Sequence, residues 1–242
     1  MSSTLGLLAD TIASSYVDGP GNRFAVFLQG CNFDCIACHN PNTIPRRKVG
    51  TSRFVEVDDL LAQVRDAAPF LSGVTVSGGE ATCQWQFVQE LFHGIKSDRE
   101  LSRLTTFVDS NGNADLHVWD VLLPWMDAAM IDLKALDADV HHYLTGEDNE
   151  RVLASIEHLA DLSRLYEVRL LLVPGVNDTD AQLDRTAEWL LRVDPEMRVK
   201  LIGFRQHGTR RIAAGFADMT PERLDHARSV LEHHGVQDVV TV

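Results

Sequence analysis

Three cysteines, Cys31, Cys35 and Cys38, lie close together in a chain of 242 residues that has four cysteines in all. Their spacing, C-x3-C-x2-C, allows three thiolates to bind three irons of one [4Fe-4S] cube and leaves the fourth iron without a protein ligand. Such an iron can bind a small molecule and react with it. The spacing therefore predicts a cluster-binding loop over residues 31–38 with one open coordination position.

Two other interpretations of this loop stay open. A structural zinc site could take His39 as its fourth ligand, although such sites usually combine two ligand pairs separated by a longer span, and this sequence has no second pair. The three thiols could also be buried side chains that bind nothing. The fourth thiol, Cys83, has no cysteine neighbour, and we expect it to be a small core residue.

The composition limits the class of protein. Hydrophobic residues make up 45% and charged residues 24% of the chain, as is usual for a globular protein with a substantial core. The formal net charge of -13 disfavours nucleic acids and anionic membranes as partners. Residues 1–10 lack the features of a signal peptide, and no run approaches the roughly 18 apolar residues that span a bilayer. We therefore expect a cytoplasmic protein whose partners are proteins and small molecules.

Short β-branched apolar runs alternate with amphipathic stretches along nearly the whole chain, which predicts repeated βα units around a parallel sheet. The expected strands are Phe24–Gln29, Gly73–Ser77, Leu104–Asp109, Ala129–Leu133, Glu167–Val173 and Val199–Phe204. The expected helices are Val57–Ala68, Gln86–Lys96, Asp115–Met126, Glu150–Leu162, Thr179–Leu191 and Thr220–His234.

Six βα units are fewer than the eight of a closed barrel. We therefore predict an α/β fold, a partial and open parallel βα barrel formed by a single domain over residues 1–242. Polar and turn-forming residues recur at the carboxyl ends of the expected strands, where barrel enzymes have their active sites. These residues are Cys31, Ser77–Glu80, Asp109–Gly112, Asp132–Lys134, Pro174–Gly175 and Arg205.

Over nearly its whole length, the sequence resembles the radical S-adenosylmethionine enzymes. The three-cysteine loop and the turn Gly78-Gly79-Glu80 are typical of that superfamily. Within it, the chain is similar to pyruvate formate-lyase activating enzymes and other glycyl-radical enzyme activases, on the motifs Asp18-Gly19-Pro20-Gly21, Cys38-His39-Asn40 and Asp132-Leu133-Lys134. The resemblance implies one [4Fe-4S] cluster, held by the three cysteines, that reductively cleaves S-adenosylmethionine to methionine and a 5′-deoxyadenosyl radical.

The resemblance also implies contacts with S-adenosylmethionine. The two glycines of the Gly-Gly-Glu turn lack a Cβ and would admit the amino group of the cofactor, while Glu80 would steady the turn. Without the resemblance, Arg169 would be read as an ordinary exposed charge in a strand. The implied contacts up to the fifth strand are Ala37, His39, Gly78, Gly79, Glu80, Asp132, Lys134 and Arg169.

The same family can bind a monovalent cation beside the carboxylate of the cofactor. The positions that match this site are Asp109, Ser110, Met130 and Asp132. Hard oxygen ligands at two adjacent strand ends suit such an ion. The alternative is an Asp-Ser-Asn-Gly turn followed by a capping aspartate.

The sequence departs from the family pattern at two places. Ala37 replaces an aromatic residue that can pack against adenine. Arg205 takes the place of a histidine after the sixth strand, with His207 two residues later, and we predict that one of the two contacts the adenosine, favouring Arg205. We expect the other histidines, including His141-His142 and His233-His234, to lie at the surface.

The function implied by the resemblance is that of an activase, which removes a hydrogen atom from the Cα of one glycine in a glycyl-radical enzyme. A flavodoxin or ferredoxin-type protein would donate the electron. A second hypothesis keeps the radical chemistry but makes the substrate a small molecule or a short peptide. A third is a zinc-stabilised interaction module without catalysis.

Overall fold

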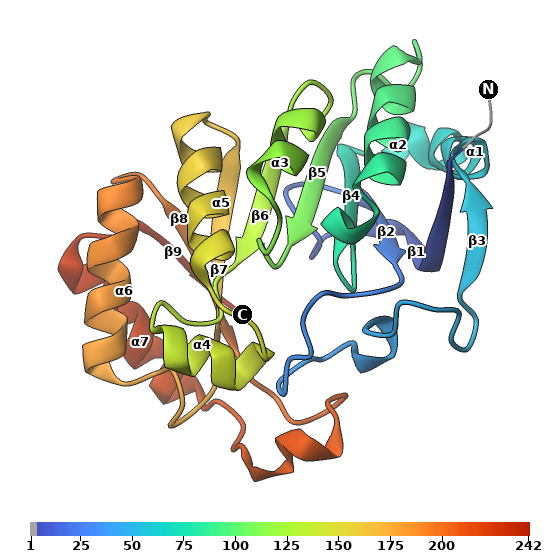
Figure 1. The fold of residues 1–242 in the computed structure, drawn as a ribbon. Coiled ribbons are helices and arrows are strands. Elements are labelled where there is room, and N and C mark those ends of the chain that lie inside the picture. The colour runs from blue at the N-terminus through green and yellow to red at the C-terminus, as the bar shows by residue number, and fades with distance from the viewer. Residues whose placement is uncertain (1–3) are drawn as a thin grey trace. The chain divides into compact units, whose positions relative to one another are not determined.

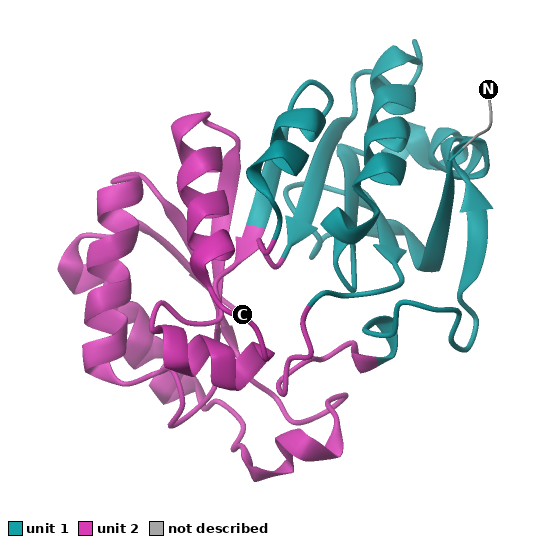
Figure 2. Cartoon of the chain, viewed as in Figure 1, with its two compact units in different colours: residues 1–32, 42–110, 114–130 teal, residues 33–41, 111–113, 131–242 magenta. Residues whose placement is uncertain are grey.

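The structure is a computed structural model that describes residues 4–242, so the first three residues of the segment 1–10 lie outside the described residues. The chain forms two compact units (Figure 2). Unit 1 comprises residues 1–32, 42–110 and 114–130, and unit 2 comprises residues 33–41, 111–113 and 131–242. The prediction that residues 1–242 form a single domain stays a prediction.

The sheet of unit 1 has the strand order β3-β1-β2-β4-β5. Strand β2 is parallel to β4, and β4 is parallel to β5, whereas β1 is antiparallel to both β2 and β3. The inner strands β2 and β4 are almost continuously buried, as expected for parallel strands covered on both faces. The bounds are β1 Leu5–Ser15, β2 Arg23–Leu28, β3 Arg53–Glu56, β4 Gly73–Gly78 and β5 Thr105–Ser110.

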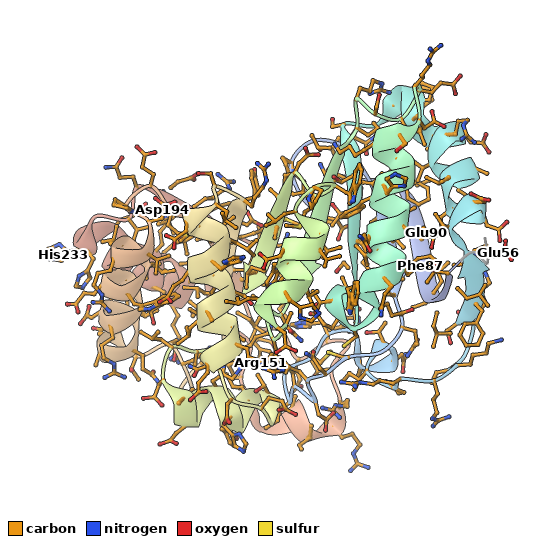
Figure 3. The ribbon with its side chains drawn as sticks, turned by 45° about the horizontal axis from the view of Figure 1, so that its top comes forward. Glu56, Phe87, Glu90, Arg151, Asp194 and His233 are labelled. Carbon is orange, nitrogen blue, oxygen red and sulfur yellow. The ribbon has the colours of Figure 1, made fainter. Side chains whose placement is uncertain are left out.

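The helices of unit 1 pack beside these strands (Figure 1). Helix α2 buries five apolar residues that recur along one face, among them Phe87, whose ring occupies the space that a Cβ at Gly6 would need. On the same helix, Glu90, which is labelled in Figure 3, accepts a hydrogen bond from the backbone N–H of Thr4. The bounds are α1 Val57–Ala67, α2 Trp85–Ser97 and α3 Leu116–Leu122, with short 3-10 turns η1 Pro41–Thr43, η2 Ala68–Phe70 and η3 Ala81–Gln84.

Unit 2 contains the parallel strands β7, β8 and β9, in that order, and β6 contributes residues to both units. Helix α6 begins with a capping box formed by Thr179 and Gln182, and α7 begins with Thr220 as N-cap and ends at Gly235 in the left-handed region. The strand bounds are β6 Ala128–Asp132, β7 Leu165–Leu172, β8 Arg198–Gly203 and β9 Asp238–Thr241. The helix bounds are α4 Ala138–Thr145, α5 Glu150–Asp161, α6 Asp180–Val193, α7 Pro221–His234 and the 3-10 turn η4 Arg211–Gly215.

The predicted fold class is confirmed, because the structure has a mostly parallel α/β sheet in which β3 and β9 each have a neighbour on one side only. All six expected strands are present, as β2 and β4 to β8, with ends within two residues of those expected. The sequence did not reveal β1, β3, β9 or helix α4. Helix α3 was expected to continue to Met126 but ends at Leu122, just before Pro124. Within residues 4–242, no helix is long and apolar enough to cross a bilayer.

Candidate active site

The turn after β4 in unit 1 is held by its own backbone. The N–H of Gly79 donates to the carbonyl of Leu28 at 2.8 Å, and the N–H of Glu80 donates to the carbonyl of Gly30 at 2.8 Å. A Cβ on Gly78 would lie 2.2 Å from backbone atoms of Leu28, and one on Gly79 would lie 2.3 Å from the Gly30 oxygen. The backbone contacts alone therefore require glycine at both positions, without any ligand. This requirement stands beside the role in cofactor binding that the resemblance implies.

Glu80 is buried and joins this turn to the end of β5. Its Oε1 accepts hydrogen bonds from the Thr82 N–H at 2.9 Å, the Thr82 hydroxyl at 2.6 Å and the Ser110 hydroxyl at 2.8 Å. Next to Ser110 at the end of β5, Asp109 accepts a hydrogen bond from the Ser77 hydroxyl of β4 at 2.9 Å. Within unit 1, hydrogen bonds thus connect Glu80 with Ser110, and Asp109 with β4. All three residues are implied in ligand or cation binding. Met130, also implied in cation binding, is fully buried in β6.

Cys31, the first residue of the cluster-binding loop, belongs to unit 1. Its N–H donates to the Ile44 carbonyl at 3.0 Å, and its own carbonyl accepts from Arg46 Nε at 2.9 Å. The residue before it, Gly30, has φ +107, a conformation that side chains rarely adopt. Cys83 is exposed, so the prediction that it is a core residue is wrong. It lies on the one-turn helix η3.

The rest of the cysteine loop belongs to unit 2, where the last turn of α4 holds it. The N–H groups of Asp34 and Ile36 donate to the carbonyls of Thr145 and Leu144, at 3.0 and 2.9 Å. These carbonyls belong to the last turn of a helix and have no partner within it, so the loop satisfies them. Ala37 is buried in an apolar cluster together with Leu144, Val173, Phe204 and Ala213.

Burial makes the free thiols of this loop weak acids. It raises the pKa of Cys35 to about 11, and it also raises the pKa of Cys38. Lys134 opposes both shifts, and Arg210 also opposes that of Cys38. Without metal, both thiols are protonated at neutral pH, so binding iron must release their protons.

Asp132 and Lys134 form an ion pair at the end of β6, with Lys134 Nζ 2.7 Å from Asp132 Oδ2. Burial disfavours the ammonium group, but the Asp132 carboxylate and the Cys35 thiol outweigh that effect and raise the pKa of Lys134. The backbone carbonyl of Lys134 accepts from Asn177 Nδ2 at 2.7 Å, which fixes the segment that follows β6. The pair therefore keeps a cation close to Cys35 and Cys38.

Arg169 is buried in β7, so the reading of it as an ordinary exposed charge does not hold. Its Nε lies 2.7 Å from Glu167 Oε1, and the other oxygen of Glu167 lies 3.3 Å from Arg198 Nε. Glu167 and Arg169 are two residues apart in a strand and share one face of the sheet. A buried cation already held in position is suited to meet an anionic ligand.

The segment after β8 contacts the cysteine loop through its backbone and through Phe204. His39 Nε2 is 2.8 Å from the Arg205 carbonyl oxygen, and its ring lies 5.7 Å from that of Phe204. Arg205 lines a cavity with Met219, on the opposite side of the extended chain from Phe204. Its side chain therefore points toward α7 rather than toward Ala37.

Two residues of this segment were not singled out as ligand contacts from the sequence. Phe204 is the residue whose side chain packs with Ala37, and strand alternation after β8 could have indicated it. Arg210 contacts the loop directly, and no local pattern indicates that contact. His207 is exposed, and which of Arg205 and His207 reaches an adenosine stays a prediction.

His141 corrects the expectation that the histidine pair of α4 lies at the surface. It is completely buried, with its ring centroid 5.5 Å from that of Phe33 in an edge-to-face arrangement. Burial lowers its pKa to about 4, so the ring is neutral at pH 7. The neighbouring His142 is exposed, as expected.

Among residues 4–242, no three His, Cys, Asp or Glu side chains are arranged so that they could hold a metal ion. The chemistry of the donors nevertheless fits a [4Fe-4S] cluster. None of the four cysteines is in a disulfide, and three of them have the spacing that three cluster irons require. Lys134 and Arg210 offset the negative charge that thiolates would bring, and the buried Nε of Arg210 has no acceptor among the described residues.

Comparison with known proteins connects this site to a family. Residues 25–190 match the model of the radical SAM superfamily. The chain is 30% identical over 238 residues to the pyruvate formate-lyase-activating enzyme of Streptococcus mutans, covering 93% of this chain and 90% of that protein. It is also 30% identical over 247 residues to the pyruvate formate-lyase 1-activating enzyme of Escherichia coli K12, covering 96% of this chain and 98% of the relative.

A solved structure supports the same fold. The radical SAM methyltransferase of Sphaerobacter thermophilus superposes with a TM-score of 0.69 at 20% identity, covering 91% of this chain and 66% of that one. The protein belongs to the radical SAM superfamily, whose members use a [4Fe-4S] cluster and S-adenosylmethionine. Within that superfamily, it is an oxidoreductase of the pyruvate formate-lyase activating enzyme type.

Proposed function

We propose that this enzyme is a glycyl-radical enzyme activase, which removes a hydrogen atom from one glycine of a partner protein. The observation that carries the proposal is the similarity to two pyruvate formate-lyase-activating enzymes along nearly the full length of both chains. The motifs around Cys38, Asp132 and Lys134 support the same branch of the superfamily. The cytoplasmic location and the flavodoxin or ferredoxin-type electron donor are part of this proposal.

Cys31, Cys35 and Cys38 would hold the cluster as thiolates. When bound, the cluster supplies the electron that cleaves S-adenosylmethionine. The backbone amides of Asp34 and Ile36 donate hydrogen bonds to α4, and these bonds hold the backbone around Cys35 in place in unit 2. Because both thiols have raised pKa values, assembly of the cluster depends on pH and is favoured at higher pH.

The residues around the thiols would bind the cofactor. The amides of Gly79 and Glu80 already donate to other carbonyls, so the Gly-Gly-Glu turn would offer its own backbone carbonyls, beside two residues that have no side chain. The ion pair of Asp132 and Lys134 offers one acceptor and one set of donors to a polar ligand. Arg169 offers a buried guanidinium, and Asp109 and Ser110 offer oxygens for a monovalent cation. Arg205 and His207 are the two candidate contacts for the adenosine, and the position of Arg205 in the cavity beside α7 favours His207.

The test uses the full chain, purified without oxygen and reduced, with S-adenosylmethionine and a candidate glycyl-radical enzyme. Electron paramagnetic resonance should reveal a glycine-centred radical on the partner. The signal should be absent with a partner whose target glycine is replaced by alanine. Formation of 5′-deoxyadenosine with a small molecule or short peptide, and with no glycyl-radical enzyme, would instead favour that class of substrate. A colourless protein containing zinc would contradict radical chemistry altogether.

A further inference from the structure

The guanidinium of Arg210, just before η4 in unit 2, binds the backbone of the cysteine loop. Its Nη2 donates to the carbonyl oxygens of Asp34 and Cys35, at 2.9 and 2.7 Å. Its Nη1 donates to the Asp34 carboxylate at 2.7 Å. Three hydrogen bonds from one rigid, planar cation therefore converge on two consecutive residues, the second of which is a proposed cluster ligand.

These contacts differ from those of an ordinary surface ion pair. The side chain of Asp34 is 70% exposed, so its attraction to Arg210 alone contributes little. The carbonyl contacts, in contrast, are charge-assisted bonds to main-chain atoms and restrict the peptide that carries Cys35. Within the loop itself, the Cys35 carbonyl receives only a long hydrogen bond of 3.4 Å, from the N–H of Cys38. Arg210 is the stronger donor to that carbonyl.

The remaining donor of the guanidinium, Nε, indicates that Arg210 does more than bind the loop backbone. Arg210 Nε is buried and has no hydrogen-bond partner among the described residues. A buried donor without an acceptor is costly, and such atoms occur where another group binds. The positive charge of Arg210 also acts on Cys38, in the same direction as that of Lys134. Two cations, one after β6 and one before η4, therefore act on Cys38.

We propose that Arg210 is a positioning residue for the iron–sulfur cluster: it holds the backbone at Asp34 and Cys35 for ligation, and its charge makes the cluster easier to reduce. A nearby cation stabilises the more negative, reduced state of a cluster and raises its reduction potential. This inference rests on the proposed ligation by Cys31, Cys35 and Cys38. It does not depend on the identity of the substrate.

The experiment separates the positional effect from the charge effect, using the reconstituted full chain without S-adenosylmethionine or partner. Iron release to a chelator reports how firmly the loop holds the cluster, and a redox titration followed by electron paramagnetic resonance reports the potential. In Arg210→Gln, iron release should be faster by roughly tenfold, the scale of one lost charge-assisted hydrogen bond, and the potential should become more negative. In Arg210→Lys, the charge remains, so the potential should stay closer to that of the wild type while iron release is still accelerated.

Arg211→Gln is the matched control, because Arg211 is the next residue, is exposed, and its side chain makes no hydrogen bond or ion pair within residues 4–242. It should behave as the wild type in both measurements. Asp34→Asn should leave the rate of iron release nearly unchanged, because the carbonyl contacts remain.

Unchanged iron release and potential in Arg210→Gln, with a normal circular dichroism spectrum, would overturn this inference while leaving the proposed function intact. Equal effects in Arg211→Gln would also overturn it, since they would indicate a general surface-charge effect. Failure of the wild-type chain to take up a cluster would overturn the proposed function as well.

Discussion

The Gly-Gly-Glu turn of unit 1 and the cysteine loop of unit 2 are held in different ways. The turn is held by bonds to residues of neighbouring strands, with Glu80 as a buried acceptor for Thr82 and Ser110. The loop is held by a helix end and by Arg210, whose contact with Cys35 joins residues 175 positions apart in the sequence. Both regions therefore depend on residues outside their own motifs, but the turn is held by neighbouring strands of unit 1, whereas the loop depends on the far more distant Arg210.

The largest expected effect concerns the loop. Replacement of Cys31, Cys35 or Cys38 singly by alanine should abolish the cluster, because three thiolates are the minimum that holds the cube. Cys83→Ala is the matched control and should retain iron, since that thiol is exposed and alone in its part of the sequence. Iron analysis and the absorbance of the reconstituted variants provide the measurement. Iron lost from Cys83→Ala but kept in one of the other three would show that the ligands are wrongly assigned.

The next effect concerns the turn. In Gly79→Ala, the new methyl group would meet the Gly30 oxygen at 2.3 Å, and the free energy of unfolding should fall by about 3 kcal/mol. Cluster content should fall as well, because Gly30 precedes Cys31. Gly215→Ala is the control, since no atom lies within 4 Å of the position a Cβ would take there. Denaturant unfolding of the apo chain measures the difference, and equal stability of the two variants would contradict the packing described for the turn.

The stability of the protein should depend on pH through His141 of α4, the helix whose last turn binds the cysteine loop. His141 has its pKa lowered by burial to about 4, so between that value and 6.5 the unfolded chain binds a proton that the folded chain does not. Stability should therefore fall as the pH drops from 7 to 4, by about 3 kcal/mol from this group. His141→Leu should remove most of this pH dependence, measured as the free energy of unfolding of the apo chain at each pH.

The control is His233→Leu, because His233 is exposed on α7 (Figure 3). That variant should keep the wild-type slope. If the free energy of unfolding of His141→Leu depended on pH as steeply as that of the wild type, the buried ring of His141 would not be neutral in the folded chain.

The smallest expected effect is that of Arg205→Ala. Because this side chain lines a cavity with Met219 and points toward α7, the affinity for S-adenosylmethionine should change by less than about tenfold, which corresponds to 1.4 kcal/mol. Equilibrium binding to the reconstituted protein is the measurement, with His207→Ala measured in parallel. A larger loss in Arg205→Ala would restore it as a direct contact of the adenosine.

The sequence predicted those features that depend on local patterns. Six inner strands have apolar β-branched runs long enough to identify them, and the motifs that follow them could be assigned from their spacing. Strand β1 was missed because its second half is largely exposed and antiparallel, so it lacks the buried run of the others. His141 was misjudged because its burial depends on Phe33, more than 100 residues away. The contacts of Arg210 could not be predicted for the same reason.

The proposed hydrogen abstraction can be tested most directly with deuterium. The partner glycyl-radical enzyme is produced with glycine in which deuterium replaces both hydrogens of the Cα. It is then incubated with this protein, a reductant and S-adenosylmethionine. Removal of a hydrogen atom from the target glycine predicts 5′-deoxyadenosine that contains one deuterium, detected by mass spectrometry. Abundant 5′-deoxyadenosine without deuterium, in a reaction that contains the partner, would contradict the account.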